Sequence, residues 1–550
     1  MAAPLRGLSS SGLTNLTANL PALALAALVL LPIVWSLVSA LAQSLDWAAW
    51  QALWADPQSL PAWRMTVWTG LVSTALTWLT VASLLASGFI RKQLTRGMQW
   101  LPALLATPHA AMAIGLVLWL SPSGWALRLV SPSLTGFTSP PAWVTTQDAW
   151  GLGLILALWL KEVPFLLWIA CAHLLREDVR RRTLAESTVA QTLGYTPAQA
   201  FTQVLWPQLA PRLGWPALAV LAYGLTVVDM AIIIGPTTPP TLALLAWGWL
   251  NDADLATQAQ GAAAALLLTV TVGAAAALLG LRKMVLRVWV QFTGSLVLRA
   301  QKTPVNAAGM FLAVYAAVWW ALAVGSVSGA WAFPNLFPSL WTLQAWHSVA
   351  DSAATLWTSL ALAAVSASAS VLWVVAWLEL APRTWHTALR PAYLLLMVLP
   401  AVLWVVGLYG AALHWRIEGQ WLGLIIAHSL MVLPFCLLSL APAYLAVDAR
   451  QAAVAASLGH SRWAYLCRIK WPLLKAAMCG AWAVGFAVSV AQYLPTLYVG
   501  LGRFATVTTE AVNLASGGQR NVMSAYAALQ MLLPVAVFAG AAWLGRARRF

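Results

Sequence analysis

The chain has 550 residues, of which 61% are hydrophobic and 8% are charged. Soluble domains are about 45–50% apolar and about 25% charged, so this composition excludes a soluble fold, a disordered chain and a secreted disulfide scaffold. The net charge of +15 falls in short gaps between apolar runs, which indicates membrane topology rather than nucleic-acid binding.

The apolar runs predict an all-α protein with about twelve transmembrane helices. A bilayer core about 30 Å thick is crossed by about 20 apolar residues in a helix. The run that begins at Leu20 is too long for a typical cleaved signal peptide, so we predict a retained first span. Runs of this length lie near residues 20–42, 63–89, 99–120, 150–175, 214–236, 258–281, 309–330, 352–378, 391–413, 421–446, 477–500 and 523–545.

The distribution of Lys and Arg predicts the orientation of these spans. Alternate gaps between the spans are rich in basic residues, as in Arg180-Arg181-Arg182. Cytoplasmic loops carry the excess of Lys and Arg in membrane proteins, so both termini are predicted to lie in the cytoplasm. The only basic residues in the gaps on the other side are Arg64, Arg128, Arg416, Arg503 and Arg520.

Glycine and proline spacings in the first half of the chain recur in the second half. Gly and Pro each fix a backbone feature, so their matched spacing predicts two parallel six-helix repeats. The matched landmarks are Trp68-Thr69-Gly70-Leu71 with Trp357-Thr358-Ser359-Leu360, Pro108 and Gly115 with Pro400 and Gly407, Gly153 and Pro164 with Gly423 and Pro434, and Gly194 and Pro207 with Gly459 and Pro472. The predicted organisation is an N-terminal segment with the first helix (1–62), a first transmembrane domain (63–282), a cytoplasmic linker (283–308), a seventh helix with a periplasmic loop (309–351) and a second transmembrane domain (352–550).

Two of the cytoplasmic gaps are long, and they occupy equivalent places between the fourth and fifth spans of each half. Each begins with an Ala-rich helical stretch, turns at Gly194 or Gly459, and resumes as an amphipathic stretch that ends at Pro207 or Pro472. Gly ends a helix readily in the left-handed conformation, and Pro interrupts the helix that follows. The sequence therefore predicts a helix–turn–helix on the membrane surface in each half.

These two gaps resemble the coupling segment of ABC importer permeases, the family that works with a periplasmic binding protein. The family pattern begins with Glu-Ala-Ala, and this chain has Thr188 and Ala453 at the position of that Glu. As two fused six-span units, the chain most resembles the double permeases of the thiamine and ferric-iron importer type. The matching positions are Thr188, Ala190, Leu193, Gly194 and Pro207 in the first gap and Ala453, Ala455, Leu458, Gly459 and Pro472 in the second.

The resemblance implies a transport subunit of the bacterial cytoplasmic (inner) membrane. Its partners would be an ATP-binding ABC subunit in two copies and a periplasmic substrate-binding protein, with a small molecule or an ion as the substrate. A nucleotide-binding P-loop needs a Gly-Lys pair, and no Lys in the chain follows a Gly. The sequence therefore predicts no catalytic site, no cofactor, no metal and no nucleic acid, with ATP hydrolysed by the partner.

Several polar residues lie inside the predicted spans, where an ionisable group is costly and is a functional candidate by default. Glu162, Asp229, His428 and Gln492 are the candidate pathway-lining residues, and Lys161 lies beside Glu162. The alternative for each is a structural hydrogen bond between helices. For the whole chain, the alternatives are a twelve-span secondary transporter, which couples to ions instead of ATP, and a membrane scaffold without a substrate.

Overall fold

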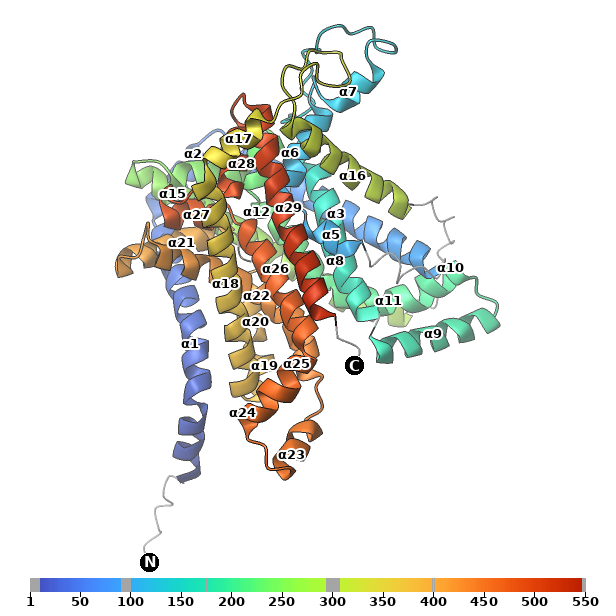
Figure 1. Cartoon of the computed structure of the whole chain (residues 1–550), viewed down its shortest axis with the longest axis vertical. Coiled ribbons are helices and arrows are strands. Elements are labelled where there is room, and N and C mark those ends of the chain that lie inside the picture. The colour runs from blue at the N-terminus through green and yellow to red at the C-terminus, as the bar shows by residue number, and fades with distance from the viewer. Residues whose placement is uncertain are drawn as a thin grey trace, which may run out of the picture.

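The computed structural model describes residues 10–90, 100–174, 176–292, 307–397, 399 and 401–546. Within these ranges the regular structure is helical, apart from one isolated β-bridge between Ser328 and Trp341. Figure 1 shows a bundle in which α1, α18 and α29 run roughly along the long axis, with α7 and α23 at opposite ends. The prediction of an all-α protein is confirmed.

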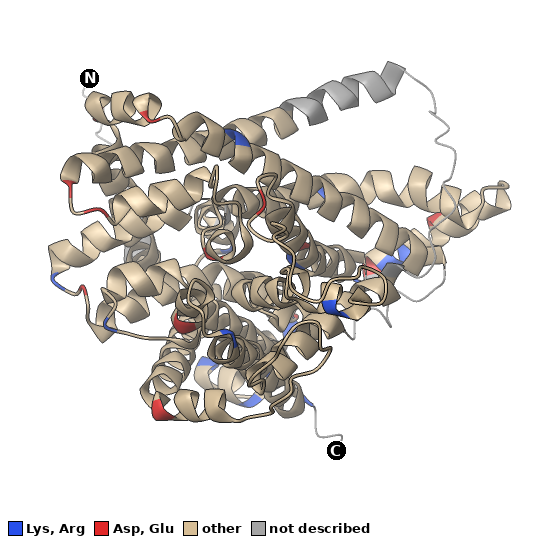
Figure 2. Cartoon of the chain, turned by 90° about the horizontal axis from the view of Figure 1, so that it is seen from above, with Lys and Arg blue, Asp and Glu red and all other residues tan. Residues whose placement is uncertain are grey.

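Nine helices or joined helices of the described residues are long and apolar enough to cross a membrane. They confirm a polytopic membrane protein, and the ribbon in Figure 2 shows how sparsely charged residues occur along the helices. The nine are α1 (Ser10–Ser44), α3 (Ser59–Ile90), α6 (His109–Leu120) with α7 (Trp125–Val130), α8 (Leu152–Leu174), α15 (Leu255–Phe292), α16 (Ala307–Ser326), α18 (Ala353–Leu380), α22 (Trp421–Leu445) and α29 (Arg520–Gly545).

Four of the predicted spans are each divided into two helices. Three of these, at 214–236, 391–413 and 477–500, are not among the nine long helices of the described residues, whereas the span at 99–120 is represented by α6 with α7. Thr107, before Pro108, is extended with ψ 116°, because a residue that precedes proline is disfavoured in the helical region. Val227, before Asp229, is also extended. The divided pairs are α5 (Leu101–Ala106) with α6, α12 (Gly214–Thr226) with α13 (Asp229–Ile234), α20 (Arg390–Leu395) with α21 (Ala401–Trp415), and α26 (Lys475–Val490) with α27 (Leu494–Gly500).

Short elements connect these helices, and part of the predicted organisation falls outside the described residues. Residues 293–306 of the predicted linker and the landmark Pro400 belong to the part that is not described, whereas α15 continues to Phe292, beyond the predicted start of the linker. The short helices outside the two long gaps are α2 (Trp47–Ala55), α14 (Leu242–Leu250), α17 (Gln344–Asp351), α19 (Arg383–Ala388) and α28 (Val507–Ala515).

One sequence separation relates several local features of the two halves. It relates the start of α13 to that of α27 and the start of α14 to that of α28. The first backbone amide of each of these last two helices is held alike: Leu242 N–H donates to Thr66 Oγ1 at 2.8 Å, and Val507 N–H donates to Ser359 Oγ at 2.8 Å. The two halves therefore hold the starts of α14 and α28 in the same way, although the alignment of Trp68 with Trp357 pairs Ser359 with Gly70 and not with Thr66.

The first helix of each half contacts the other half, although α16 also packs extensively on α29 of its own half. Helix α1 packs against α21, and Trp373 Nε1 of α18 donates to Leu25 O of α1 at 3.0 Å. Helix α16 packs against α6, and Trp119 Nε1 of α6 donates to Ala317 O of α16 at 2.7 Å. These reciprocal contacts join the halves into one helical body.

The buried side chain of Arg128 joins the loops at the α7 end of the molecule. From the sequence, this residue is only one of the basic residues in the gaps between spans. The Arg128 side chain is 6% exposed, and its Nη1 donates to Ala332 O at 2.9 Å and to Asn335 O at 2.5 Å. Its Nε donates to Ser123 O at 2.8 Å, and its guanidinium lies 4.4 Å from the centre of the Trp331 ring. Arg128 thereby fastens the loop after α6 to the loop after α16.

Candidate functional site

Both long gaps fold as helix–turn–helix segments, in agreement with the sequence. We call residues 177–213 the Gly194 loop and residues 450–474 the Gly459 loop. Both lie on the side of the helical body away from α7 (Figure 1). The Gly194 loop contains α9 (Glu177–Thr192), α10 (Pro197–Ala200), the π-helical turn η1 (Phe201–Leu205), α11 (Trp206–Leu209) and the 3-10 turn η2 (Ala210–Leu213). The Gly459 loop contains α23 (Arg450–Ser457), α24 (Arg462–Tyr465), the π-helical turn η3 (Leu466–Lys470) and α25 (Trp471–Leu473).

The two turns have the same backbone geometry. Gly194 has φ +92° and Gly459 has φ +79°, in the left-handed region that favours glycine. Tyr195 N–H donates to Ala190 O at 3.1 Å, and His460 N–H donates to Ala455 O at 3.0 Å. These bonds close the first helix of each loop as in a Schellman motif, which reverses the chain direction sharply.

A π-helical turn precedes the Trp-Pro pair in each loop. Thr196 first caps α10 together with Gln199, and Ser461 caps α24 through Ala464 N–H. Pro207 follows η1 and Pro472 follows η3; proline has no N–H and clashes with the preceding helical turn, so the ladder is displaced there. The two prolines thus explain why the helix takes the π-helical form at the same point of both loops.

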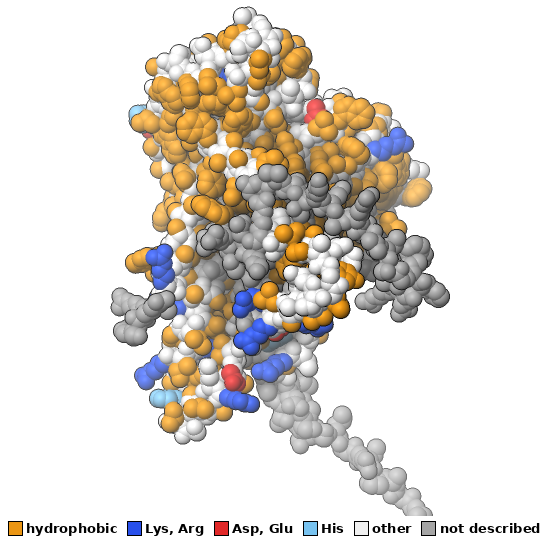
Figure 3. Space-filling model, turned by 90° about the vertical axis from the view of Figure 1, so that its right-hand side faces the viewer, with side chains coloured by type: hydrophobic (Ala, Val, Ile, Leu, Met, Phe, Trp, Pro, Cys, Tyr) orange, Lys and Arg blue, Asp and Glu red, His pale blue; other side chains and the backbone are white. Residues whose placement is uncertain are grey.

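The turns present apolar side chains to the surroundings. Leu193 is 74% exposed and Leu458 is 70% exposed, whereas Ala190 and Ala455 are buried against their own loops. Thr188 and Ala453 lie exposed on the preceding helices, and Pro207 and Pro472 are exposed at the far ends. One large apolar side chain is thus exposed at the same point of both turns, which makes the two turns candidate contact surfaces. Figure 3 shows the right-hand side of the molecule as drawn in Figure 1. Most of the Lys and Arg visible there lie in its lower part, below a mainly hydrophobic surface.

Aromatic contacts attach the Gly194 loop to the membrane helices. The ring centres of Trp206 and Trp78 lie 5.3 Å apart, edge to face, and those of Phe201 and Phe89 lie 5.9 Å apart. Trp78 and Phe89 both belong to α3. The loop therefore rests on α3 through non-polar packing.

A carboxylate braces the Gly194 loop internally. Gln208 Nε2 donates to Glu186 Oε2 at 2.8 Å, and Arg182 Nε lies 2.7 Å from Glu186 Oε1. The hydrogen bond from the Arg182 guanidinium lowers the pKa of the Glu186 carboxyl below its ordinary value. Glu186 therefore joins α9 to α11 as an ionised group.

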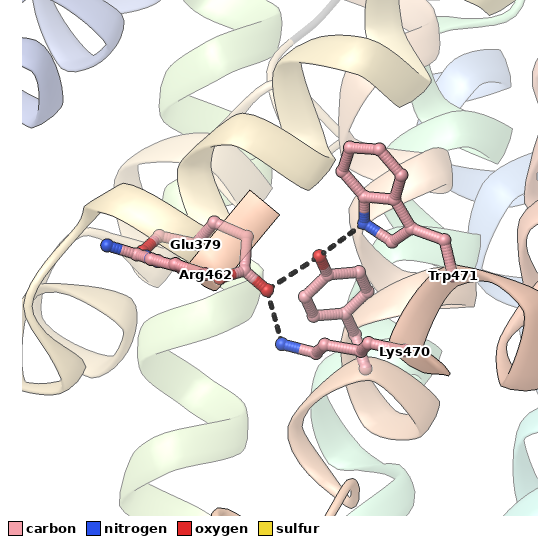
Figure 4. Close-up of polar contacts among 5 residues, drawn as sticks. Glu379, Arg462, Lys470 and Trp471 are labelled. Atoms are coloured by element: carbon pink, nitrogen blue, oxygen red, sulfur yellow. Dashed lines mark hydrogen bonds and ion pairs between the residues drawn. The ribbon is translucent and has the colours of Figure 1, made fainter. Parts of the chain in front are cut away.

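A polar network attaches the Gly459 loop (Figure 4). Glu379, at the C-terminal end of α18, forms ion pairs with Lys470 and with Arg462. Tyr444, at the end of α22, donates its hydroxyl to Glu379 Oε1 at 2.8 Å and accepts a hydrogen bond from Trp471 Nε1 at 3.1 Å. Sequence reasoning missed this network, because its members are far apart in the chain and the only signal was a carboxylate at the end of a span.

Two of the four candidate pathway residues lie in one interior cluster. Glu162 on α8 lies 3.2 Å from His109 Nε2 on α6, and Tyr223 OH on α12 donates to Asp229 Oδ1 on α13 at 3.4 Å. The His109 and Tyr223 rings are 4.5 Å apart, which joins the two pairs. The sequence did not single out His109 or Tyr223. We call these four residues the His109 cluster.

The other two candidates lie around α22, α26 and α27. His428 is 1% exposed, and its ring nitrogens lie 2.9 Å from Ser489 Oγ and 3.0 Å from Thr496 Oγ1. This bridging geometry fits a structural hydrogen bond between helices. Gln492 is half-buried at the break between α26 and α27. Lys161, beside Glu162, instead donates to Leu105 O at 3.3 Å.

The clusters can hold and orient polar groups inside the helical body. Among the described residues, no group of three or more His, Cys, Asp and Glu side chains is placed to hold a metal ion. The two exposed glycine turns repeat outside the helical body, one in each long loop. The His109 cluster lies inside the helical body, among helices of the first half of the chain.

Comparison with known proteins identifies the family. No family model matches the chain. The inner membrane ABC transporter permease protein YnjC of Escherichia coli (strain K12) is 35% identical over 538 residues, which cover 96% of this chain and 97% of that protein. Identity at this level along nearly the full length of both proteins places the chain in the ABC transporter permease family, as the permease subunit of an ABC transporter.

Proposed function

We propose that this permease is the membrane subunit of a binding-protein-dependent importer in the bacterial inner membrane. The observation that carries the proposal is the pair of exposed glycine turns, each with a large apolar side chain at its tip. The name of the Escherichia coli relative supports the inner-membrane location. The partners would be two copies of an ATP-binding subunit and one periplasmic substrate-binding protein, and the substrate a small molecule or an ion.

Two parallel six-helix repeats, with twelve spans and both termini in the cytoplasm, are the proposed architecture. The recurrence of the divided helices, the π-helical turns and the Thr66 and Ser359 hydrogen bonds supports it. We assign the two transmembrane domains to residues 63–282 and 352–550. Each is completed to six helices by the helix that precedes it, in residues 1–62 and 309–351, as fused double permeases of the thiamine and ferric-iron importer type are built. The likeness to that type concerns the arrangement of the helices and not the substrate.

Each loop would bind one ATP-binding subunit by placing its turn in a hydrophobic groove, as amphipathic helices do. The contact residues proposed are those on and around the turns, with Leu193 and Leu458 as the apolar centres. When ATP draws the two subunits together, the loops would move with them and rock the two halves of the permease. The proposed contact positions are Thr188, Ala190, Leu193, Gly194, Pro207, Ala453, Ala455, Leu458, Gly459 and Pro472.

The translocation pathway would pass the His109 cluster in the first half. Glu162 and Asp229 are carboxylates at membrane depth beside a divided helix, and polar side chains at such sites typically mark a substrate path. In the second half, His428 and Gln492 lie beside the other divided helix, α26 with α27. Because helices broken at membrane depth are tolerated where they line a cavity or are buried in protein, these breaks support a pathway between the halves.

Purification of the tagged native chain from its own membrane in mild detergent tests the proposal. We expect a P-loop ATPase to co-purify with the permease, and the binding protein to raise ATP hydrolysis once it carries its substrate. Mass spectrometry identifies the partners, and an unrelated polytopic membrane protein purified in parallel is the control. A native complex that contains no ATPase, under conditions that preserve other ABC transporters, contradicts the proposal.

Neutral variants of the His109 cluster test its place in the pathway. Glu162→Gln and Asp229→Asn replace the carboxyl groups that His109 and Tyr223 contact, and leaving a buried hydrogen-bonding partner unsatisfied costs about 1–3 kcal/mol. We therefore expect about tenfold lower substrate-stimulated ATP hydrolysis in the reconstituted complex, with the ATPase still bound. Asp252→Asn, at an exposed loop carboxylate, should leave the rate unchanged. Equal rates in all three variants would contradict the assignment.

A further inference from the structure

The carboxylate of Glu379 is shared by donors from three segments of the chain. Tyr444 OH and Lys470 Nζ both contact Oε1, the former at 2.8 Å, and Arg462 Nη2 lies 3.3 Å from Oε2. A second bond from Arg462 Nη2 reaches Glu379 O at 2.8 Å. In Figure 4, the Lys470 nitrogen points at the carboxylate of Glu379, and a dashed line joins the two groups. These contacts from Tyr444, Lys470 and Arg462 therefore fix the position of the Glu379 carboxylate.

The pair with Lys470 is the protected part of this network. The side chains of Glu379 and Lys470 are 14% and 15% exposed, whereas that of Arg462 is 67% exposed. Charge–charge attraction is stronger away from water, and exposed pairs contribute little. The Lys470 ammonium also lies 4.1 Å from the centre of the Tyr444 ring, a cation–π arrangement. Lys470 thus has two partners on the membrane helices.

This pair lies where the Gly459 loop meets the membrane helices. Glu379 ends α18 and Tyr444 lies in the last turn of α22, and these two helices pack against each other. Lys470 ends η3, directly before α25, and α26, which leads back into the bundle, begins at Lys475. A displacement of the loop therefore acts on α18 and α22 through side chains that lie at their ends.

The attachment of the other loop has a different chemistry. The Gly194 loop rests on α3 through Trp206 against Trp78 and Phe201 against Phe89. Apolar packing is non-directional and insensitive to neutralisation of a charge, whereas a shielded ion pair loses its function when one charge is removed. The two loops are therefore distinguishable by a single charge-neutral substitution.

We propose that Glu379 is the positioning residue of the Gly459 loop: through its ion pair with Lys470 it transmits displacement of that loop to α18 and α22. This inference rests on the proposed docking of the loops to the ATP-binding subunits. The Gly194 loop passes its displacement to α3 by aromatic packing. Neutralising Glu379 thus uncouples one half of the permease and leaves the other half coupled.

The test uses the full native complex of permease, ATPase and binding protein. Backbone hydrogen exchange is measured in residues 59–90, 353–380 and 421–445 before and after the ATPase is trapped with Mg-ATP and orthovanadate. In the native complex we expect trapping to change exchange in α18, α22 and α3. In Glu379→Gln, which keeps the side-chain shape, the change should disappear from α18 and α22 and persist in α3. Glu186→Gln, which removes the internal carboxylate of the Gly194 loop, is the matched control and should retain the α18 and α22 response.

Two further variants separate transmission from a general loss of structure. Lys470→Arg keeps the positive charge and should retain the response, whereas Lys470→Gln should lose it. Glu379 and Lys470 act as a pair. The double variant Glu379→Gln with Lys470→Gln should therefore lose no more of the exchange response in α18 and α22 than either single variant. A full α18 and α22 response in Glu379→Gln overturns the inference while ATPase binding stands. Failure of the native permease to bind an ATPase overturns the proposed function instead.

Discussion

Replacing Gly194 and Gly459 together by valine is expected to abolish retention of the ATP-binding subunit by the permease. Both residues have positive φ, at +92° and +79°, and a β-branched residue is a genuine outlier there. Holding a residue in such a region costs about 1–3 kcal/mol. A Cβ at either position meets no atom within 4 Å, so the cost is one of backbone conformation and not of steric contact. The turn would open and move Leu193 and Leu458 away from their positions.

Co-purification of the ATPase with the tagged permease measures this effect. The body of the permease should remain folded, because both turns lie outside the buried core. Gly194→Asn with Gly459→Asn is the matched control, since Asn tolerates the left-handed region, and it should retain most of the bound ATPase. Undiminished binding by the valine variant would show that the turns are not the docking surface. Single valine variants should each lose less than the double variant.

The glycine turns could be predicted from the sequence because their cause is local. A left-handed Gly after an Ala-rich helix and a Pro at a fixed distance beyond it act on the backbone of their own segment. The same is true of the long apolar helices, whose existence follows from the length of the apolar run. Such features need no knowledge of the rest of the fold.

The divided helices were not predicted, because hydropathy measures apolarity and not backbone continuity. Residues 214–236 and 477–500 are apolar throughout most of their length, yet each contains a break, before Asp229 and before Pro495. In the structure, Val227 and Val228 at the first break are buried, and Ala491 and Gln492 at the second are half-buried. A break inside the membrane is tolerated where it is buried in protein or lines a cavity. Only the three-dimensional packing decides that a break is tolerated.

The polar networks were missed for another reason: their members are distant in sequence. His109 contacts Glu162 across 53 positions, and Lys470 contacts Glu379 across 91 positions. The sequence identified Glu162 by its depth in a span, but it carried no sign of which helix would face it. Arg128 is the same case, because its buried position depends on a loop from the other half of the chain.

The second large effect is expected at Gly407, where α1 crosses α21. A Cβ at Gly407 would lie 1.9 Å from Ser36 O, a backbone atom of α1. A backbone atom cannot rotate away as a side chain does, so Gly407→Ala must push the two helices apart. Overpacking of this kind costs about 1–3 kcal/mol and occasionally more. The thermal unfolding midpoint of the detergent-purified permease should therefore fall.

Two alanine variants calibrate this result. Gly410 lies one turn further along α21, and its nearest neighbour would be Ser39 Cβ at 3.8 Å, an ordinary contact distance. Gly410→Ala should be neutral or stabilising, because Ala is favoured over Gly in a helix by about 1 kcal/mol. Gly115→Ala on α6 would meet Val318 Cγ1 at 2.5 Å, a side-chain atom, and should fall between the two. Equal midpoints for Gly407→Ala and Gly410→Ala would contradict the close packing of α1 on α21.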